Sequence, residues 1–351
     1  MNDNIYMTRA LELATLGRGT VSPNPLVGCV IVHEKPGQKP VIIGEGWHQR
    51  YGEPHAEVNA VRSVTDETLL PEATVYVTLE PCSHFGKTPP CADLLVEKRV
   101  KRVVVCNDDP NPLVAGKGLA KLRAAGIDVQ TNVLAERGRE LNCRFFTFIE
   151  KKRPYLILKW AETADGFIAP SSYQPLVISG ALSRQLVHQW RSEEDAIMVG
   201  TNTARYDNPK LNVRLWQGRN PVRVVIDKTL QLPRELNLFD GSQRTLVYHL
   251  DNVPQPADFT LPATQFIPLK ASEPFLPQLL DDLYNQKIQS LIVEGGTFLL
   301  ESMLNQGLWD EARVFKSPKV LGDGLAAPTL RGRLQSNERI GNDWLTTYRP
   351  V

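Results

Sequence analysis

The sequence predicts an α/β protein built from two domains, and three observations support this. The chain has 351 residues, while one domain usually takes ~150. Apolar runs rich in β-branched residues alternate with segments whose apolar residues recur at helical spacing. A polar seam, FFTFIEKKRP at 145–154, interrupts this alternation and reads as a linker or domain edge. We therefore expect one domain at residues 1–149 and a second at 150–351.

In the first domain, strands and helices are expected to alternate. A short helix should cover residues 5–16, and further helical spacing occurs at 55–64, 91–100 and 116–127. Extended, β-branched runs predict strands at 26–32, 41–48, 74–80, 100–107 and 128–134.

The strand pattern restarts after the seam. Strands are expected at 154–161, 195–200, 221–227, 244–250, 289–296 and 311–321, with helices at 183–193 and 297–308. The proline-rich stretch 254–274 reads as a surface excursion, and the last fifty residues predict only one or two strands.

Composition excludes several classes of protein. The net charge of +1 and the lack of an aromatic–basic stripe argue against nucleic acid and against an acidic membrane surface. No window approaches the roughly 18 apolar residues of a membrane span. The first residues lack the pattern of a signal peptide, and five cysteines are an odd number for a disulfide framework. A cytoplasmic protein is therefore expected.

Two segments, PHAEVNA at 54–60 and EPCSHFGKTPPC at 80–91, predict a metal site. His55 and Cys91 each follow proline at the expected start of a helix, where the positive helix end favours thiolate and hydroxide. With Cys82 they give one imidazole and two thiolates, which leaves the fourth position of a tetrahedral zinc open for water. Zinc lowers the pKa of such a water toward neutrality, and Glu57 would shuttle its proton to a leaving amine.

The pattern matches the H-x-E and P-C-x-x-C signature of zinc nucleobase deaminases, except in spacing. Eight residues separate Cys82 from Cys91, where the signature has two. His84 is thus a rival third ligand, or a fourth ligand that would close the site into a structural one. Two unrelated surface thiols are the remaining alternative.

In the second half, LIVEGGTFLLESML at 291–304 carries a strand into Gly295, Gly296 and a helix. Glycines allow close approach of a ligand, and the helix start offers free N–H groups to phosphate. It is not G-x-G-x-x-G, so a Rossmann fingerprint is not supported, and such a junction by itself is more often a simple turn.

Taken together, the motifs resemble a known family. PNPLVGCVIV, GEGWHQRYGEPHAEVNA, VTLEPCSHFGKTPPC and NDDPNP, in that order, are similar to the deaminase half of the bifunctional riboflavin-biosynthesis deaminase/reductase. LKWAETADGFIA, MVGTNTARYDNPKLNVR and the Gly295–Gly296 segment are similar to its reductase half. The long insertion between the cysteines is that family's own form.

The resemblance implies a cytidine-deaminase-like three-layer α/β/α domain followed by a dihydrofolate-reductase-like α/β domain. It implies one Zn²⁺ and NADPH as cofactors, a phosphoribosylamino-pyrimidine as substrate, and a homo-oligomer. The implied reactions are zinc-hydroxide deamination of 2,5-diamino-6-(5-phosphoribosylamino)pyrimidin-4-one, then NADPH reduction of the ribosyl group to ribityl.

The resemblance also implies roles for individual residues. His55, Cys82 and Cys91 would hold zinc, and Glu57 would be the proton shuttle. The deaminase substrate would be bound by Asn24, His48, His84, Lys87, Asp109 and Asn111. The reductase substrate would be bound by Lys159, Arg191, Leu211, Arg214 and Glu294. The nicotinamide cofactor would lie near Ala161, Thr203, Asp207, Gly296, Thr297, Phe298, Leu299, Leu300, Glu301 and Ser302.

The second half departs from that family at three positions. Pro175 and Val177 stand where a serine and a tryptophan are common, and Glu162 is larger and more polar than expected. These departures motivate an alternative hypothesis, a deaminase fused to a domain that only binds. A third hypothesis, a nucleic-acid base deaminase, is disfavoured by the charge.

Overall fold

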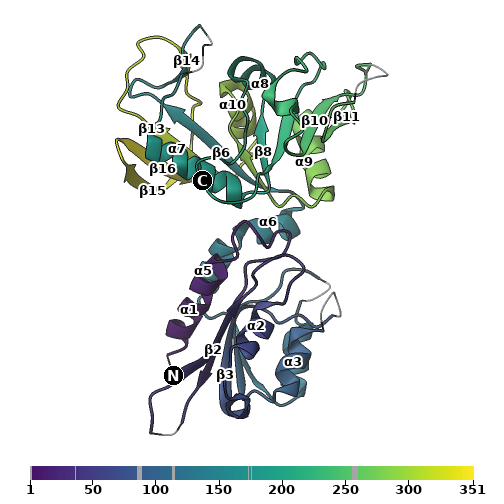
Figure 1. The fold of residues 1–351 in the computed structure, drawn as a ribbon, viewed down its shortest axis with the longest axis vertical. Helices are drawn as coiled ribbons and strands as arrows, with labels where there is room; N and C mark the ends of the chain where they lie inside the picture. The colour runs from purple at the N-terminus through teal and green to yellow at the C-terminus, as the bar shows by residue number, and fades with distance from the viewer. Residues whose placement is uncertain are drawn as a thin grey trace. The chain divides into compact units, whose positions relative to one another are not determined.

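The computed structural model describes residues 2–35, 37–84, 89–112, 115–172, 174, 176–254 and 260–351. The chain divides into two compact units, Met1–Lys152 and Arg153–Val351 (Figure 1). The boundary expected at 149/150 falls inside α6, Cys143–Lys151, so the seam that reads as a linker is mostly helical. None of the helices in the described ranges is long and apolar enough to cross a membrane.

A five-stranded sheet with the order β2-β1-β3-β4-β5 forms the centre of the first unit. β1 runs antiparallel to both β2 and β3, while β3, β4 and β5 are parallel to one another. The strands are β1 Gly28–His33, β2 Val41–Trp47, β3 Ala73–Leu79, β4 Arg102–Asn107 and β5 Asp128–Gln130.

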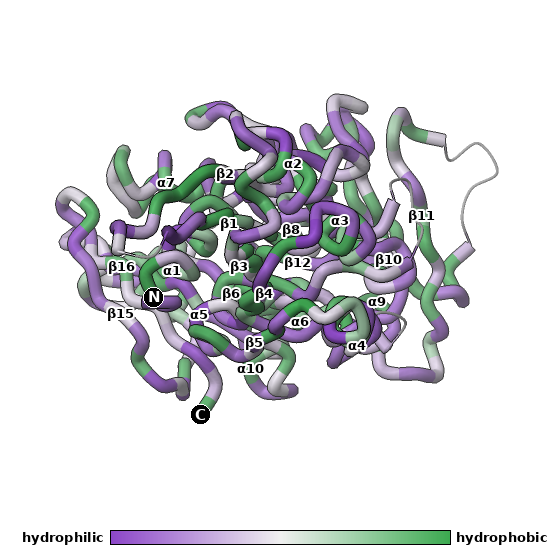
Figure 2. Tube along the Cα trace, turned by 90° about the horizontal axis from the view of Figure 1, so that it is seen from below, coloured by the Kyte–Doolittle hydropathy of each residue, from purple (hydrophilic) through white to green (hydrophobic). Residues whose placement is uncertain are grey.

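Helices cover both faces of this sheet, because successive side chains of a strand point to opposite faces. Cys29 and Ile31 of β1 pack toward α2, α3 and α4, whereas Val30 and Val32 pack toward α1. The result is a three-layer α/β/α unit whose central strands are largely hydrophobic in Figure 2. The helices are α1 Asp3–Thr15, α2 Ala56–Arg62, η1 Glu67–Glu72, α3 Cys91–Glu97, α4 Lys117–Ala124, α5 Ala135–Leu141 and α6.

The second unit is built on a nine-stranded sheet with the order β11-β10-β9-β8-β12-β6-β13-β16-β15. The strands from β11 to β13 are parallel, and β16 and β15 add an antiparallel edge. The strands are β6 Tyr155–Glu162, β8 Ala196–Val199, β9 Val222–Ile226, β10 Thr245–Leu250, β11 Thr264–Leu269, β12 Ser290–Val293, β13 Glu311–Lys316, β15 Arg333–Ile340 and β16 Asp343–Arg349. A separate pair joins β7 Phe167–Ala169 to β14 Leu325–Ala326.

Among the described residues of the second unit, four helices and a short 3₁₀ turn accompany this sheet, and Figure 1 labels several of them. α9 and α10 bury leucines and a methionine against one face, together with alternate residues of β6, β8, β9, β10 and β12. α7 stacks Trp190 on Phe315 of β13, with ring centroids 5.5 Å apart. The helices are α7 Ala181–Glu193, α8 Thr201–Asp207, η2 Asn237–Phe239, α9 Phe275–Asn285 and α10 Thr297–Asn305.

Most predicted strands and helices are confirmed, and two predictions need correction. The last fifty residues contain more than the one or two strands expected, because β13, β14, β15 and β16 all lie among their described residues. The proline-rich stretch 254–274 is not only an excursion, because β11 extends the parallel sheet within it, while 255–259 lie outside the described residues. Its strand was missed because Pro268 sits in it, and proline is confined to edge strands or bulges. β11 is the end strand of the sheet, which explains why the proline is tolerated.

Candidate active sites

The first candidate site is a cluster of His55, Cys82 and Cys91, whose ligand atoms all lie within 4.8 Å of one another. His55 Nδ1 is 3.6 Å from the sulfur of Cys82 and 3.4 Å from that of Cys91. Bond lengths of ~2.1–2.3 Å around a tetrahedral zinc place neighbouring ligand atoms about 3.5–3.8 Å apart. The donor set and its spacing therefore fit zinc.

Two helix starts position these ligands, as the sequence predicts. His55 is the residue before α2, and Cys91 is the first residue of α3. The backbone N–H of Cys91 donates to the sulfur of Cys82 at 3.3 Å. The Cys91 side chain and this N–H, together with His55, lower the pKa of the Cys82 thiol, which favours the thiolate that a metal needs.

A second layer of contacts orients the turn before His55. The Asn24 amide donates to Nε2 of His48 at 3.1 Å, and Nδ1 of His48 in turn donates to the carbonyl of Pro54 at 3.2 Å. Asn59 donates to the same carbonyl at 3.2 Å. The His48 and His55 rings meet edge to face, 5.4 Å apart, so both predicted substrate residues Asn24 and His48 lie beside the metal cluster.

Glu57 lies in the first turn of α2 and is only 3 % exposed. Burial, and then the charge of Cys82, raises the pKa of this carboxyl to about 7. A buried carboxyl two residues after His55 can exchange protons with groups held at the cluster.

The other predicted deaminase residues are placed unevenly. Asp109 is half-buried and accepts the backbone N–H of Asn111 at 2.8 Å, and burial raises the pKa of its carboxyl to about 6. His84 is exposed and is not one of the three residues whose ligand atoms converge in the described part of the chain. Lys87 lies outside the described residues.

The second candidate site is a cavity of about 950 Å³ in the second unit, at the upper end of the range for small-molecule sites. It lies at the carboxyl ends of the parallel strands β6, β8, β9 and β12, the usual position of sites in α/β sheets. Fourteen of the fifteen predicted reductase residues line it: Lys159, Ala161, Arg191, Thr203, Asp207, Arg214, Glu294, Gly296, Thr297, Phe298, Leu299, Leu300, Glu301 and Ser302. The fifteenth, Leu211, is buried and does not line it.

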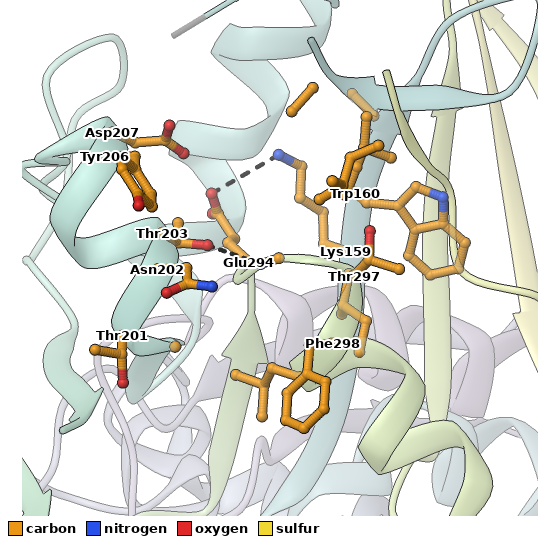
Figure 3. A pocket seen from close by; sticks show the side chains of 18 of the residues that line it. Lys159, Trp160, Thr201, Asn202, Thr203, Tyr206, Asp207, Glu294, Thr297 and Phe298 are labelled. Carbon is orange, nitrogen blue, oxygen red and sulfur yellow. Dashed lines mark hydrogen bonds and ion pairs between the residues drawn. The ribbon is translucent and has the colours of Figure 1, made fainter. Parts of the chain in front are cut away.

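A buried ion group forms the floor of this cavity. Glu294 accepts two hydrogen bonds from Arg191, at 2.9 and 2.7 Å, and lies 3.7 Å from the Lys159 amine. Figure 3 shows Lys159 of β6 pointing toward Glu294, with Thr203, Tyr206 and Asp207 of α8 beside them. Burial raises the pKa of Glu294, but the charges of Arg191 and Lys159 outweigh it and lower the pKa to about 2. Burial lowers the pKa of Lys159.

The structure explains why glycine occurs at Gly295 and what its neighbour Gly296 binds. A Cβ on Gly295 would meet the backbone N of Gly200 at 2.6 Å, so glycine is required where β12 and β8 end side by side. The Gly296 N–H then donates to the Thr203 hydroxyl at 2.8 Å, which joins the start of α10 to α8. The close approach that we expected of a ligand is therefore made, at Gly295, by the chain itself.

Sequence reasoning missed several residues that line the cavity, among them Arg184, His188, Thr201, Asn202 and Lys228. Arg184 lies two turns before Arg191 on α7, so helical spacing could have found it. Lys228 lies two residues after the apolar run of β9, at the carboxyl end of the strand, where sites in parallel sheets gather. Of the departures, Val177 lines the cavity and its carbonyl accepts from Lys319 at 2.6 Å, while Pro175 lies outside the described residues. Glu162 accepts from the Trp160 indole at 3.0 Å.

His188 gives the second unit a predicted pH dependence. Burial and the cationic Arg191 and Arg214 lower its pKa from 6.5 to about 4, against the opposing effect of Glu294. The neutral ring accepts the Arg214 backbone N–H at 3.2 Å. The pKa of His188 is lower in the folded than in the unfolded protein. The stabilisation that the neutral ring contributes is therefore complete above pH 6.5 and is lost as the pH falls toward 4.

We therefore expect the unfolding free energy of the second unit to fall more steeply in wild type than in His188→Gln between pH 6.5 and 4. Denaturant titrations at several pH values measure the unfolding free energy. Its slope against pH should differ between the two proteins by the equivalent of up to one proton per chain. Parallel slopes would contradict this role of His188.

The comparisons with known proteins agree with this geometry. Residues 154–346 match the RibD C-terminal domain, and residues 1–107 match the cytidine and deoxycytidylate deaminase zinc-binding region. Over 365 aligned residues the chain is 40% identical to riboflavin biosynthesis protein RibD of Actinobacillus pleuropneumoniae, covering 99% of this chain and 95% of that protein. This chain belongs to the RibD family.

Other RibD proteins agree over almost the whole chain. RibD of Escherichia coli K12 is 39% identical, covering 95% of this chain and 92% of that protein. Among solved structures, Acinetobacter baumannii RibD has a TM-score of 0.88 at 35% identity, covering 99% of each chain. The Thermotoga maritima diaminohydroxyphosphoribosylaminopyrimidine deaminase/5-amino-6-(5-phosphoribosylamino)uracil reductase has a TM-score of 0.87 at 37% identity, also covering 99% of each chain.

As a RibD protein, the chain is a bifunctional enzyme of riboflavin biosynthesis. It combines a cytidine-deaminase-like domain that carries the zinc-binding region with a dihydrofolate-reductase-like RibD reductase domain. The predicted fold class and the predicted pair of activities are thereby confirmed.

Proposed function

We propose that the first unit hydrolyses the exocyclic amine of 2,5-diamino-6-(5-phosphoribosylamino)pyrimidin-4-one, releasing ammonia. The observation that carries this proposal is the convergence of His55, Cys82 and Cys91 beside the buried Glu57. The name of the Thermotoga maritima relative, a diaminohydroxyphosphoribosylaminopyrimidine deaminase, supports the choice of substrate.

The residues of this unit divide the work of deamination among them. His55, Cys82 and Cys91 would hold zinc, which when bound lowers the pKa of a water molecule. Glu57 would carry a proton from the attacking water to the exocyclic amine, which leaves as ammonia while the water oxygen becomes bonded to the ring carbon. His48 and Asn24 hold the turn before His55, and Asn24, Asp109 and Asn111 contact the pyrimidine. His84 and Lys87 bind the ribose phosphate.

We propose that the cavity of the second unit binds NADPH and the deaminated product. Thr203, Asp207 and the segment 296–302 would hold the nicotinamide cofactor, which when bound would supply a hydride to C1′ of the ribosyl group. As C1′ accepts the hydride, its bond to the ring oxygen breaks and that oxygen takes a proton, which yields the ribityl chain. Lys159 is a suitable donor of this proton, because burial lowers its pKa.

The charges of the cavity support this assignment of substrate. Arg191 and Arg214 are guanidinium groups, which bind phosphate in a bidentate manner. Glu294 compensates the charges of Arg191 and Lys159, so that the cavity keeps a cationic end without an unpaired buried charge.

One reaction mixture tests both proposals. Purified protein with measured zinc content is given the diaminopyrimidine substrate and NADPH, and ammonia release and NADPH oxidation are followed together. We expect one ammonia and one NADPH per substrate, with ammonia release lost after zinc removal and restored by zinc. Ammonia release without NADPH oxidation would contradict the reductase proposal, and full deamination by metal-free protein would contradict the deaminase proposal.

A further inference from the structure

Glu80 is a buried carboxylate that none of the steps above uses. It ends the sequence VTLE, two residues before Cys82, and is 4 % exposed. Its backbone N–H donates to the carbonyl of Asn107 at 2.9 Å, which continues the pairing of β3 with β4. Glu80 therefore lies at the end of the sheet, next to the segment that carries Cys82.

The Glu80 carboxylate binds both ends of the segment that connects β4 to α4. Oε2 accepts the backbone N–H groups of Asp109 at 3.4 Å and Gly116 at 2.9 Å. Oε1 accepts those of Gly118 at 2.9 Å and Leu119 at 3.4 Å. One side chain thus collects four backbone donors from residues 109–119, and two of these bonds have the length of good hydrogen bonds.

The start of α4 depends on this carboxylate. Gly116, the residue before α4, gives the helix no side-chain cap, and the first turn contains no acidic residue. Glu80, the residue after β3, supplies both the missing acceptor and the negative charge that a helix start favours. A Cβ on Gly118 would meet the carbonyl of Pro81 at 2.0 Å, so α4 is seated directly on the backbone next to Cys82.

The segment fixed in this way carries Asp109 and Asn111, the residues that the proposed function places on the pyrimidine. Asp109 is bonded through its own N–H to Glu80, and Asn111 is bonded through its N–H to the Asp109 side chain. The backbone from Glu80 to Cys82 and these hydrogen bonds thus connect the metal ligand to the two residues.

We infer that Glu80 is a positioning residue of the deaminase, which fixes the substrate-binding segment 109–111 relative to the metal ligand Cys82. It does not touch the substrate or the metal and acts only through these backbone contacts. The inference rests on the proposed function, because that function gives Asp109 and Asn111 their contacts with the pyrimidine.

The test compares wild type with Glu80→Gln in the full-length chain. Gln has the shape of Glu but lacks the charge. Its amide NH₂ is a donor, so it must face backbone N–H groups whose hydrogen bonds the carboxylate accepts in the wild type. We expect KM for the diaminopyrimidine to rise at least tenfold, while kcat per bound zinc changes less than threefold. Zinc content and the rate of the reductase in the same chain should not change. Amide hydrogen exchange of residues 108–119 should accelerate.

Asp66→Ala is a matched control, because Asp66 caps η1 in the same unit by accepting the Thr68 N–H at 3.1 Å. It should lower stability without changing KM for the diaminopyrimidine. A Glu80→Gln variant that resembles this control, less stable but with wild-type KM, would overturn the inference. Loss of zinc together with loss of kcat would also overturn it, since Glu80 would then position only the metal ligand Cys82 and not the segment 109–111.

A double mutant separates this inference from the proposed function. If Glu80 acts through Asn111, the KM effects of Glu80→Gln and Asn111→Ala should overlap, and fully multiplicative effects would count against it. If Asn111→Ala alone leaves KM unchanged, the role proposed for Asn111 is wrong. In that case the exchange rates at residues 108–119 and the KM of Glu80→Gln still decide the role of Glu80.

Discussion

Glu57→Gln should lower the turnover of the deaminase by at least ~10³-fold, within the range for loss of a general acid–base group. Gln keeps the shape of the side chain but cannot carry a proton from water to the leaving amine. Because His55, Cys82 and Cys91 remain, the variant should bind zinc as wild type does. Ammonia release and metal content of the same preparation are the two measurements.

Two internal comparisons make this experiment decisive. The reductase rate of the variant should equal that of wild type, which reports an intact second unit, while wild-type zinc content reports an intact first unit. Glu72→Gln, at an exposed carboxylate at the end of η1, should leave deamination unchanged. Turnover within threefold of wild type in Glu57→Gln would exclude Glu57 as the proton shuttle.

Glu294→Gln is the second change with a large expected effect, and it acts on the other activity. Removing this charge leaves Arg191 and Lys159 as two cations buried together, since both face Glu294 in the wild type. Breaking a buried ion group by removing one partner costs about 3–5 kcal/mol. We expect the second unit to lose stability on that scale and reductase kcat/KM to fall at least 100-fold.

Denaturant unfolding and single-substrate reductase assays measure these two effects. Glu338→Gln changes an exposed carboxylate on β15 and should alter neither quantity. Ammonia release by Glu294→Gln should stay at the wild-type level. A stable Glu294→Gln protein with normal reductase kinetics would show that the ion group is dispensable.

The sequence predicts the metal cluster well, because the residues next to each ligand indicate its position. His55 and Cys91 each follow a proline at a helix start, and the structure places them at those starts. Cys82 follows the clear strand β3, so its position at the end of that strand is expected too. Glu80 looks like one more strand residue in VTLE, and only three-dimensional contacts to residues 109–119 reveal what it binds.

The reductase site is harder to predict without a family resemblance. Lys159, Arg191 and Glu294 come from three separate elements, and no local spacing indicates that they meet. The order of the strands in the sheet brings them together, since β12 lies between β6 and β8. Leu211 is buried, has a left-handed backbone (φ 50°) and does not line the cavity, so its contact with the substrate stays a prediction.

The parallel strands of the second unit also set where its chain length can vary. The cavity wall is assembled from the carboxyl ends of β6, β8, β9 and β12, whose partners are fixed residue by residue. A single inserted or deleted residue within one of these strands would turn its side chains to the opposite face and would remove its contribution to the wall. Homologues should therefore show gaps at the amino-terminal edge of this sheet and uniform length inside these four strands.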